Sequence, residues 1–283
     1  MKNLKYFFQF IIIIFFMMIF KILGLKISSF FSGKIFTTLG PIFRSNKLSQ
    51  HNLKIAFPDL TDLQRSEIIK KMWFNYGRIL AEYLFIKKLK NSKKLEAENL
   101  YILENIKKNS EPVIFISGHF NNFELMAMQI QKSGIDLAAI YRPLNNKFLN
   151  PIMEKIRKNH ICKKQIKKGR AGTKEILQHF KLGTSIALMI DQRVSEGIKS
   201  NFFDKEALTT TIPAQFAKKY NAKIVPVYIE RTTNNNFKLK FYEPINFSEK
   251  ETVESITLFL NKILEEMIAK NPEQWIWTHN RWK

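Results

Sequence analysis

The chain has 283 residues, and 45% of them are hydrophobic, so it is long and apolar enough to build one large domain with additions. A single cysteine, Cys162, excludes an intramolecular disulfide and any zinc site made of several cysteines. The formal net charge of +22 indicates an anionic partner, which can be nucleic acid, anionic lipid or an acidic protein.

The first predicted element is a membrane anchor over residues 1–25. Residues 6–20 are almost wholly apolar, and Lys21 can reach the interface while the apolar run continues to Leu25. A span of about 20 residues is enough to cross a bilayer. A signal peptide is the alternative, but no small-residue cleavage site follows the run. More Lys and Arg follow the segment than precede it, which favours a main body on the cytoplasmic face.

The next stretch, residues 26–110, is predicted to be a helical N-terminal region. Thr61 or Asp62 can cap a helix that continues to Trp73, and a second amphipathic run covers 79–89. Residues 87–94 are rich in lysine and are predicted to be a linker or a solvated face.

Residues 111–283 are predicted to form an α/β domain. Strands are predicted at 113–117, 137–141, 185–190 and 223–229, and helices at 123–132, 147–159, 173–181 and 213–220. This alternation is typical of a mostly parallel sheet that is covered by helices on both sides. An antiparallel edge strand at 237–242 and a last helix at 251–270 complete the pattern. No glycine-rich phosphate loop occurs, so the nucleotide-binding fingerprint is absent.

The strongest candidate site lies where the first of these strands gives way to a helix. Gly118 permits a tight turn, and Asn121 or Asn122 can cap the helix that follows. On one helix, His119 and Glu124 would lie about 140° apart, but with His119 in the turn their side chains can meet. A carboxylate on one imidazole nitrogen makes the other nitrogen a better general base. A purely structural histidine is the alternative.

Polar residues follow three of the predicted strands. His119, Arg142 and Asp191 each come directly after an apolar run. The carboxyl ends of parallel strands meet at one edge of the sheet, so these side chains are expected to share a crevice. Arg170, just before the next helix, can join them. Taken singly, Arg142 and Asp191 can equally be members of an ordinary ion pair at the rim.

Together these residues resemble the family of lipid A biosynthesis (late) acyltransferases, of which the lauroyl transferase is the best-known type. The resemblance runs from about residue 44 to the C-terminus. It rests on five blocks: 51–60 (HNLKIAFPDL), 118–124 (GHFNNFE, the His-x4-Glu motif), 141–143 (YRP), 191–193 (DQR) and 272–283 (PEQWIWTHNRWK). The chain departs from the family at 201–204, where NFFD replaces the usual PFFG, so the turn there must differ.

The resemblance implies a glycerolipid-acyltransferase-like α/β domain over residues 111–283. It also implies transfer of a fatty acyl chain from acyl carrier protein to a hydroxyl of a lipid A precursor at the inner membrane. His119 would be the catalytic base and Glu124 its catalytic partner. Arg142 would stabilise the oxyanion or bind an acceptor phosphate, with Arg170 and Asp191 as further substrate-binding residues. The reaction needs no metal and no cofactor.

The implied partners account for the positive charge, because acyl carrier protein, the glycolipid acceptor and inner-membrane lipids are all anionic. Nucleic acid is not expected, since the lysines are scattered and no recognised binding motif occurs. Two alternatives stay open: an acyltransferase for another glycolipid or a lysophospholipid, and a membrane-tethered, non-catalytic lipid- or nucleic-acid-binding protein. Trp275, Trp277 and Trp282 are expected either at the membrane interface or packed onto the domain.

Overall fold

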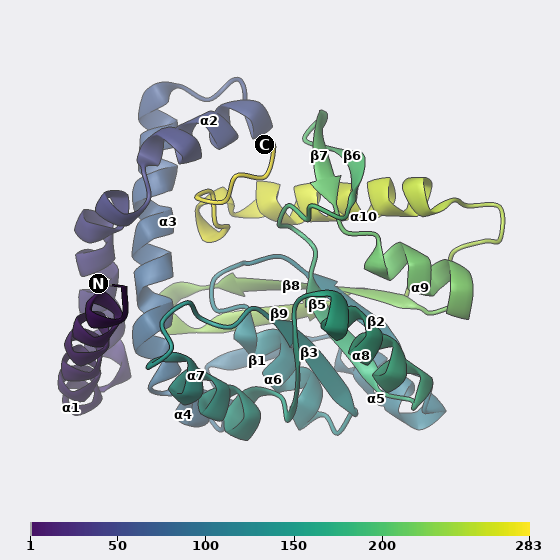
Figure 1. Cartoon of the computed structure of the whole chain (residues 1–283), viewed down its shortest axis with the longest axis horizontal. Helices are drawn as coiled ribbons and strands as arrows, with labels where there is room; N and C mark the ends of the chain where they lie inside the picture. Colours follow the sequence, from purple (N-terminus) through teal and green to yellow (C-terminus); the bar gives the residue numbers. More distant parts are fainter. Residues whose placement is uncertain (1) are drawn as a thin grey trace.

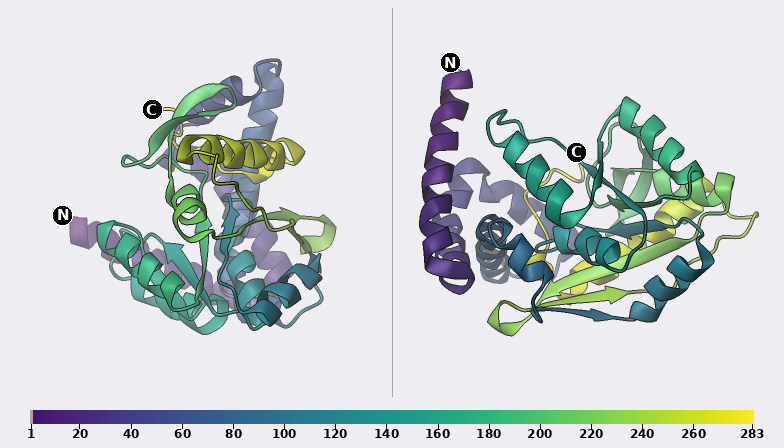
Figure 2. Two further views of the ribbon diagram at one scale, coloured as in Figure 1. Left: turned by 90° about the vertical axis from the view of Figure 1, so that its right-hand side faces the viewer. Right: turned by 90° about the horizontal axis from the view of Figure 1, so that it is seen from below.

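The computed structural model describes residues 2–283, apart from the side chains at positions 2 and 170, and begins with a long apolar helix, α1 (Lys2–Phe43). Gly24 interrupts it with φ 75° and ψ 168°, a backbone conformation that favours glycine. Within α1, residues 3–43 are long and apolar enough to cross a membrane, and only 11% of their most apolar window is buried. The break at Gly24 lies one residue before the predicted end of the anchor. The first half of α1 lies along one side of the fold (Figure 2), where Asn146 donates to the Tyr6 carbonyl at 2.8 Å.

The second half of α1 belongs to the folded body, because it packs against α3 (Asp62–Tyr83). The Ser32 hydroxyl donates to the Gly77 carbonyl at 2.6 Å, and a Cβ on Gly77 would overlap the backbone of Ser32. Thr61 caps α3 as predicted, in a reciprocal capping box with Gln64. Small residues thus allow the two helix backbones to approach closely.

The predicted helical N-terminal region also contains a strand. It holds α2 (Asn46–Ala56), α4 (Ile86–Lys90) and α5 (Leu100–Asn109), but also β1 (Leu95–Glu98). Strand β1 pairs in parallel with β9 (Phe237–Phe241). The segment predicted as a linker or solvated face includes α4, whose Leu89 is buried. The region is therefore helical as predicted, apart from β1, which the sequence analysis did not predict and which joins the central sheet.

The central sheet has seven strands in the order β1-β9-β8-β2-β5-β3-β4 (Figure 1). Its remaining members are β2 (Ile114–Ser117), β3 (Leu137–Tyr141), β4 (Lys164–Lys167), β5 (Ser185–Met189) and β8 (Ile224–Arg231). Only the β8–β9 pair is antiparallel, so the predicted mostly parallel sheet is confirmed. Strand β9 is antiparallel to β8 as predicted, but β1 lies outside it and forms the edge.

Helices cover both faces of this sheet. Right-handed crossovers place α6 (Glu124–Lys132) and α7 (Asn150–Ile156) on one face and α8 (Arg170–Lys181) and α9 (Ile212–Tyr220) on the other. Phe180 of α8 and Phe216 of α9 pack edge-to-face, with their ring centroids 5.0 Å apart. Helix α10 (Val253–Lys270) packs against α9 and the hairpin β6 (Ile198–Phe202)–β7 (Lys205–Thr209), which the sequence analysis missed.

The turn of that hairpin is the place where the sequence departs from the family pattern. Phe203 and Asp204 both have positive φ, 50° and 54°, which is the geometry of a two-residue type I′ turn. The backbone N–H of Phe203 donates to Glu265 at 2.8 Å, and the Phe203 ring packs edge-to-face on Phe57. These contacts hold a non-glycine residue in the left-handed region.

The C-terminal segment 271–283 packs onto the domain and buries two of its three tryptophans. Trp275 and Trp277 are 2% and 0% exposed, and the indole N–H of Trp282 donates to the Phe202 carbonyl at 2.9 Å. Asn52 of α2 donates to the carbonyls of Trp277 and His279. Of the two possibilities for these tryptophans, packing onto the domain is the one observed.

Candidate active site

His119 and Asp191 meet at the carboxyl ends of two neighbouring strands. Ser117 of β2 is paired with Met189 of β5. Two residues beyond each of these positions, the same register brings His119 opposite Asp191. The imidazole Nδ1 of His119 lies 2.8 Å from Oδ1 of Asp191, and the His119 backbone N–H donates to Oδ2 at 2.8 Å. The structure therefore brings these two strand ends into direct contact.

The contact with Asp191 determines the tautomer of the neutral imidazole. Burial opposes ionisation of the fully buried Asp191, but the neighbouring His119 charge and hydrogen bonds from His119 and Trp275 prevail and hold its pKa at about 2. An ionised carboxylate can only accept, so Nδ1 of His119 must donate. Nε2 is then left with a free lone pair on a side chain that is 23% exposed, as a general base requires.

Glu124 does not make the expected contact with His119. It begins α6, and its Oε1 accepts hydrogen bonds from Arg157 Nε at 2.8 Å, from Arg157 Nη2 at 2.6 Å and from the Tyr83 hydroxyl. Among the described residues, His119 has Asp191 as its carboxylate partner instead. The predicted contact between His119 and Glu124 is therefore not observed. The prediction failed because Arg157 supplies two N–H groups to Glu124, while the neighbouring strand β5 brings Asp191 directly to the imidazole of His119.

Arg157 is a site residue that the sequence analysis missed. It opens a π-helical turn, Arg157–Ile161, that continues α7, and such turns often occur at functional sites. Burial works against its charge, but Glu124 and Tyr83 outweigh burial and raise its pKa above the ordinary value. Its Nη1 is buried and has no hydrogen-bond partner in the described part of the chain. The predicted helix included this position, but no sequence signal marks a π-helical turn.

Arg142 and Arg170 are only partly placed by the structure. Arg142 follows β3 at the same edge of the sheet, is exposed, and makes no ion pair within residues 2–283. Arg170 is the first residue of α8, and its side chain lies outside the described atoms. Both backbone positions are near strand ends, but contact with His119 is not observed for Arg142.

The turn between His119 and α6 is held by residues from distant parts of the chain. Asn121 has φ 42°, and its backbone N–H donates to the Gln274 carbonyl at 2.9 Å. Asn122 donates to Glu82 at 3.1 Å, and Glu82 forms a buried ion pair with Arg231 at the end of β8. Neither asparagine caps α6, whose N-cap is Phe123 without a side-chain cap bond, so the predicted capping role is wrong.

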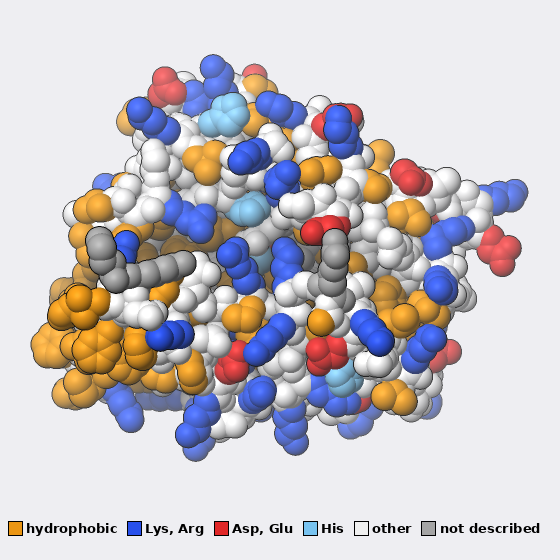
Figure 3. Space-filling model, in the orientation of Figure 1, with side chains coloured by type: hydrophobic (Ala, Val, Ile, Leu, Met, Phe, Trp, Pro, Cys, Tyr) orange, Lys and Arg blue, Asp and Glu red, His pale blue; other side chains and the backbone are white. Residues whose placement is uncertain are grey.

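His119 lines a shallow hollow between α3 and the C-terminal segment. The apolar residues that line this hollow include Met72 and Ile79 of α3, the ring of Tyr76, and Trp275 and Ile276 of the C-terminal segment. On the face shown in Figure 3, Lys and Arg side chains surround a hollowed centre, and apolar side chains gather at one side. No cluster of three or more His, Cys, Asp or Glu that suits a metal ion occurs among the described residues.

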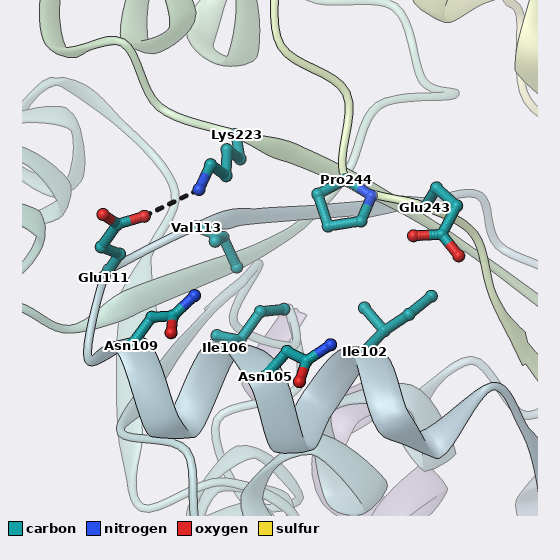
Figure 4. Close-up of a pocket in the computed structure, with 9 residues that line it drawn as sticks. All are labelled: Ile102, Asn105, Ile106, Asn109, Glu111, Val113, Lys223, Glu243 and Pro244. Carbon is teal, nitrogen blue, oxygen red and sulfur yellow. Dashed lines mark hydrogen bonds and ion pairs between the residues drawn. The ribbon is translucent and has the colours of Figure 1, made fainter.

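A second pocket lies far from His119, at the opposite ends of the strands (Figure 4). It is bordered by α5, by the Glu111–Lys223 ion pair at 2.8 Å, and by Pro244. The pocket holds neither a histidine nor a cysteine, and its charged groups are already engaged: Glu111 pairs with Lys223, and Glu243 accepts from the Tyr101 hydroxyl. The chemistry of the described residues is therefore concentrated at His119 and Asp191.

The fold and this site define an α/β protein that carries a carboxylate-held histidine at its strand ends and one long apolar N-terminal helix. The family model described as "Bacterial lipid A biosynthesis acyltransferase" matches residues 1–283, so the chain belongs to this family of acyltransferases. Membership, with the possible membrane helix, indicates a membrane-associated protein.

Curated relatives from Escherichia coli (strain K12) are similar over most of the chain. The lipid A biosynthesis lauroyltransferase is 24% identical, over 85% of this chain and 79% of its own length. The palmitoleoyltransferase is 23% identical over the same shares, and the myristoyltransferase is 23% identical over 80% of this chain and 71% of its own length. These comparisons do not single out the lauroyl type, because three acyl names match almost equally well.

Proposed function

We propose that this protein transfers a fatty acyl chain from acyl carrier protein to a hydroxyl of a lipid A precursor at the cytoplasmic face of the inner membrane. One observation carries the proposal: Asp191 holds Nδ1 of His119 at 2.8 Å and leaves Nε2 free beside a hollow. Such an imidazole can take a proton from an alcohol without a serine or cysteine nucleophile.

The reaction balances with His119 alone as proton carrier. Nε2 accepts the proton of the acceptor hydroxyl while the oxygen attacks the thioester carbonyl carbon. The tetrahedral intermediate collapses with cleavage of the carbon–sulfur bond, and the imidazolium returns the proton to the departing sulfur. Asp191 stabilises the imidazolium in between, since an anion within hydrogen-bond distance favours the charged form.

Glu124 and Arg157 form the second part of the proposed site. We assign Glu124 to holding Arg157 and the first turn of α6, and with it the adjoining turn that carries His119. The unpaired Nη1 of Arg157 is a donor for negative charge that develops on the thioester oxygen. Arg142 is assigned to a phosphate of the acceptor, because it is exposed and free of ion pairs within the described chain.

The donor and acceptor are supported by charge and by family membership. The net charge of +22 fits an acidic carrier protein and an anionic glycolipid. The relatives' names specify lipid A biosynthesis, which favours a lipid A precursor over a lysophospholipid. That the protein is of the lauroyl-transferase type stays a prediction from the sequence. The division of the chain into an anchor, a helical region and an α/β domain, at residues 25 and 110, is likewise a prediction.

The direct test is to incubate membranes that contain the protein with acyl carrier protein charged with C12, C14, C16 or C16:1 chains. Lipid A precursors and lysophospholipids are offered in parallel, and the lipid products are identified by mass spectrometry. Mass gain by one acyl chain on the lipid A precursor supports the proposal. Gain only on the lysophospholipid identifies the other acceptor class, and no gain with any donor contradicts the proposed reaction.

A further inference from the structure

Asp191 is held by more than its histidine. Its Oδ2 accepts two hydrogen bonds, one from the His119 backbone N–H and one from the indole Nε1–H of Trp275, both at 2.8 Å. Asp191 is fully buried, and Trp275 is 2% exposed, so water does not compete for this contact. A hydrogen bond to a buried charge is among the stronger ones in proteins.

Trp275 is itself fixed by the surrounding C-terminal segment. Its ring packs edge-to-face on Trp277, with centroids 4.6 Å apart, and lies 6.1 Å from the ring of Phe202. Further along the C-terminal segment, the fully buried Arg281 donates to the Leu208 carbonyl at 2.7 Å and anchors the segment to β7. The indole N–H is therefore presented to Asp191 by a packed scaffold rather than by a mobile tail.

We propose that Trp275 is a positioning residue for acyl transfer: its indole N–H holds the Asp191 carboxylate so that Nε2 of His119 faces the hollow. This assignment rests on the proposed function in taking His119 as the base. It makes the C-terminal segment a working part of the site, although residue 275 lies 84 positions from Asp191 in sequence.

Removing this N–H has a predictable electrostatic effect. The Trp275 bond withdraws negative charge density from Asp191, and without it the carboxylate accepts more strongly from Nδ1 of His119. A stronger carboxylate partner stabilises the imidazolium, so the pKa of His119 rises. The carboxylate also loses one restraint on its rotation, so His119 spends less time in the reactive orientation.

Other charges around the pair must stay constant for this shift to be interpretable. The titratable groups that interact with His119 and Asp191 or line their hollow are His279 and Arg281 of the C-terminal segment, Tyr76 of α3, and Glu273. Arg44, which directly follows α1, interacts with His279 and Tyr76. Exchange of Trp275 for Phe changes none of these side chains.

The test compares Trp275→Phe with Trp277→Phe in the full-length protein in detergent micelles. Trp277 is a matched control, because its equally buried indole N–H donates to the Pro272 carbonyl at 2.7 Å and not to Asp191. The rate at which diethyl pyrocarbonate modifies His119 is followed from pH 5 to 8 by peptide mass spectrometry, which gives the pKa of His119 without any acyl transfer. The pH profile of kcat/KM for transfer is measured in parallel.

We expect the pKa of His119 and the acid limb of kcat/KM to move upward in Trp275→Phe, with kcat/KM about 10- to 100-fold lower. In Trp277→Phe, the pKa of His119 and the acid limb of kcat/KM should both keep their wild-type values. An unchanged His119 pKa in Trp275→Phe, or an equal shift in both variants, overturns the proposal. A selective shift in a protein that transfers no acyl chain supports the positioning role and contradicts the proposed function instead.

If Trp275→Phe does not fold, 3-benzothienylalanine is placed at position 275 by nonsense suppression. This residue keeps the shape of tryptophan but has sulfur in place of the N–H group. The same selective rise in the His119 pKa is expected, and an unchanged His119 pKa overturns the proposal.

Discussion

The imidazole of His119 is held by Asp191, 72 residues away in sequence, and not by Glu124, five residues away. The contact exists because β2 and β5 are neighbours in the sheet and end at the same level. It divides the acidic residues of the site into two roles. Asp191 orients the base, while Glu124 belongs to a separate buried cluster with Arg157 and Tyr83.

Asp191→Asn should abolish most transfer while the protein still folds. An asparagine amide that donates to Nδ1 forces the imidazole proton onto Nε2, so the free lone pair is lost. A comparable exchange in a Ser-His-Asp triad costs about 10⁴-fold, and we expect about 10³- to 10⁴-fold here. Steady-state transfer and thermal unfolding should be measured on the same preparation. Activity within a few-fold of wild type would remove Asp191 from its assigned role.

Glu124 and Arg157 should be coupled in stability. Both side chains are 10% exposed, and loss of one member of a buried ion pair typically costs about 3–5 kcal/mol. We expect Glu124→Gln and Arg157→Met each to lower the free energy of unfolding by that order, and the double variant to lose less than the sum. Denaturant unfolding of the four proteins gives the coupling energy. Strict additivity would show that the pair does not act as a unit.

Most of the α/β pattern could be predicted from the sequence, since apolar runs such as β3 mark buried strands clearly. Strands β1 and β4 were missed because they lie at the sheet edges and contain no apolar run: half of the residues in LEAE and three of the four in KQIK are polar. The site could be located from strand ends, which found His119 and Asp191. Their pairing could not be predicted, because it depends on which strands are neighbours.

His279 should make stability depend on pH. Its Nε2 accepts from the Arg193 backbone N–H at 3.0 Å, and burial lowers its pKa from 6.5 to about 4. The unfolded chain therefore binds this proton at a higher pH than the folded protein. The contribution of neutral His279 to the free energy of unfolding is therefore fully present above about pH 6.5, and it is lost as the pH falls toward 4.

This effect is measured by thermal unfolding of wild type and His279→Gln between pH 4 and 8. The glutamine can still accept from Arg193 but does not titrate in this range. The difference in Tm between the two proteins should change steadily from pH 6.5 to 4 and be constant above 7. A constant difference throughout would show that His279 keeps its ordinary pKa.

Deletion of residues 1–25 should weaken membrane attachment without unfolding the domain. The deletion ends just past the break at Gly24 and leaves residues 26–43 free to keep their packing on α3. High salt screens lysine–lipid attraction but not apolar insertion. Salt washing should therefore release the truncated protein and leave the full chain in the membrane fraction. Release of the full chain by salt alone would contradict an inserted helix.

The catalytic domain should face the cytoplasm, where acyl carrier protein is found. Cys162 is 1% exposed and burial raises its thiol pKa to about 11, so it is a poor probe in the folded state. A better probe is Lys108→Cys, at an exposed position of α5, combined with Cys162→Ala. A membrane-impermeant maleimide should label position 108 only after spheroplasts are opened. Labelling of sealed spheroplasts would place the domain on the other side.

The most direct test of the account is the rate of acyl transfer by His119→Ala, measured with charged acyl carrier protein and the lipid A precursor that wild type accepts. Thermal unfolding and membrane fractionation of the same variant serve as controls for fold and attachment. We predict a folded, membrane-bound protein whose transfer is close to the rate without enzyme, because His119 is the one histidine among the described residues that line the hollow and its imidazole is the base held by Asp191. Transfer at near wild-type rate by His119→Ala would contradict the assignment of His119 as the general base.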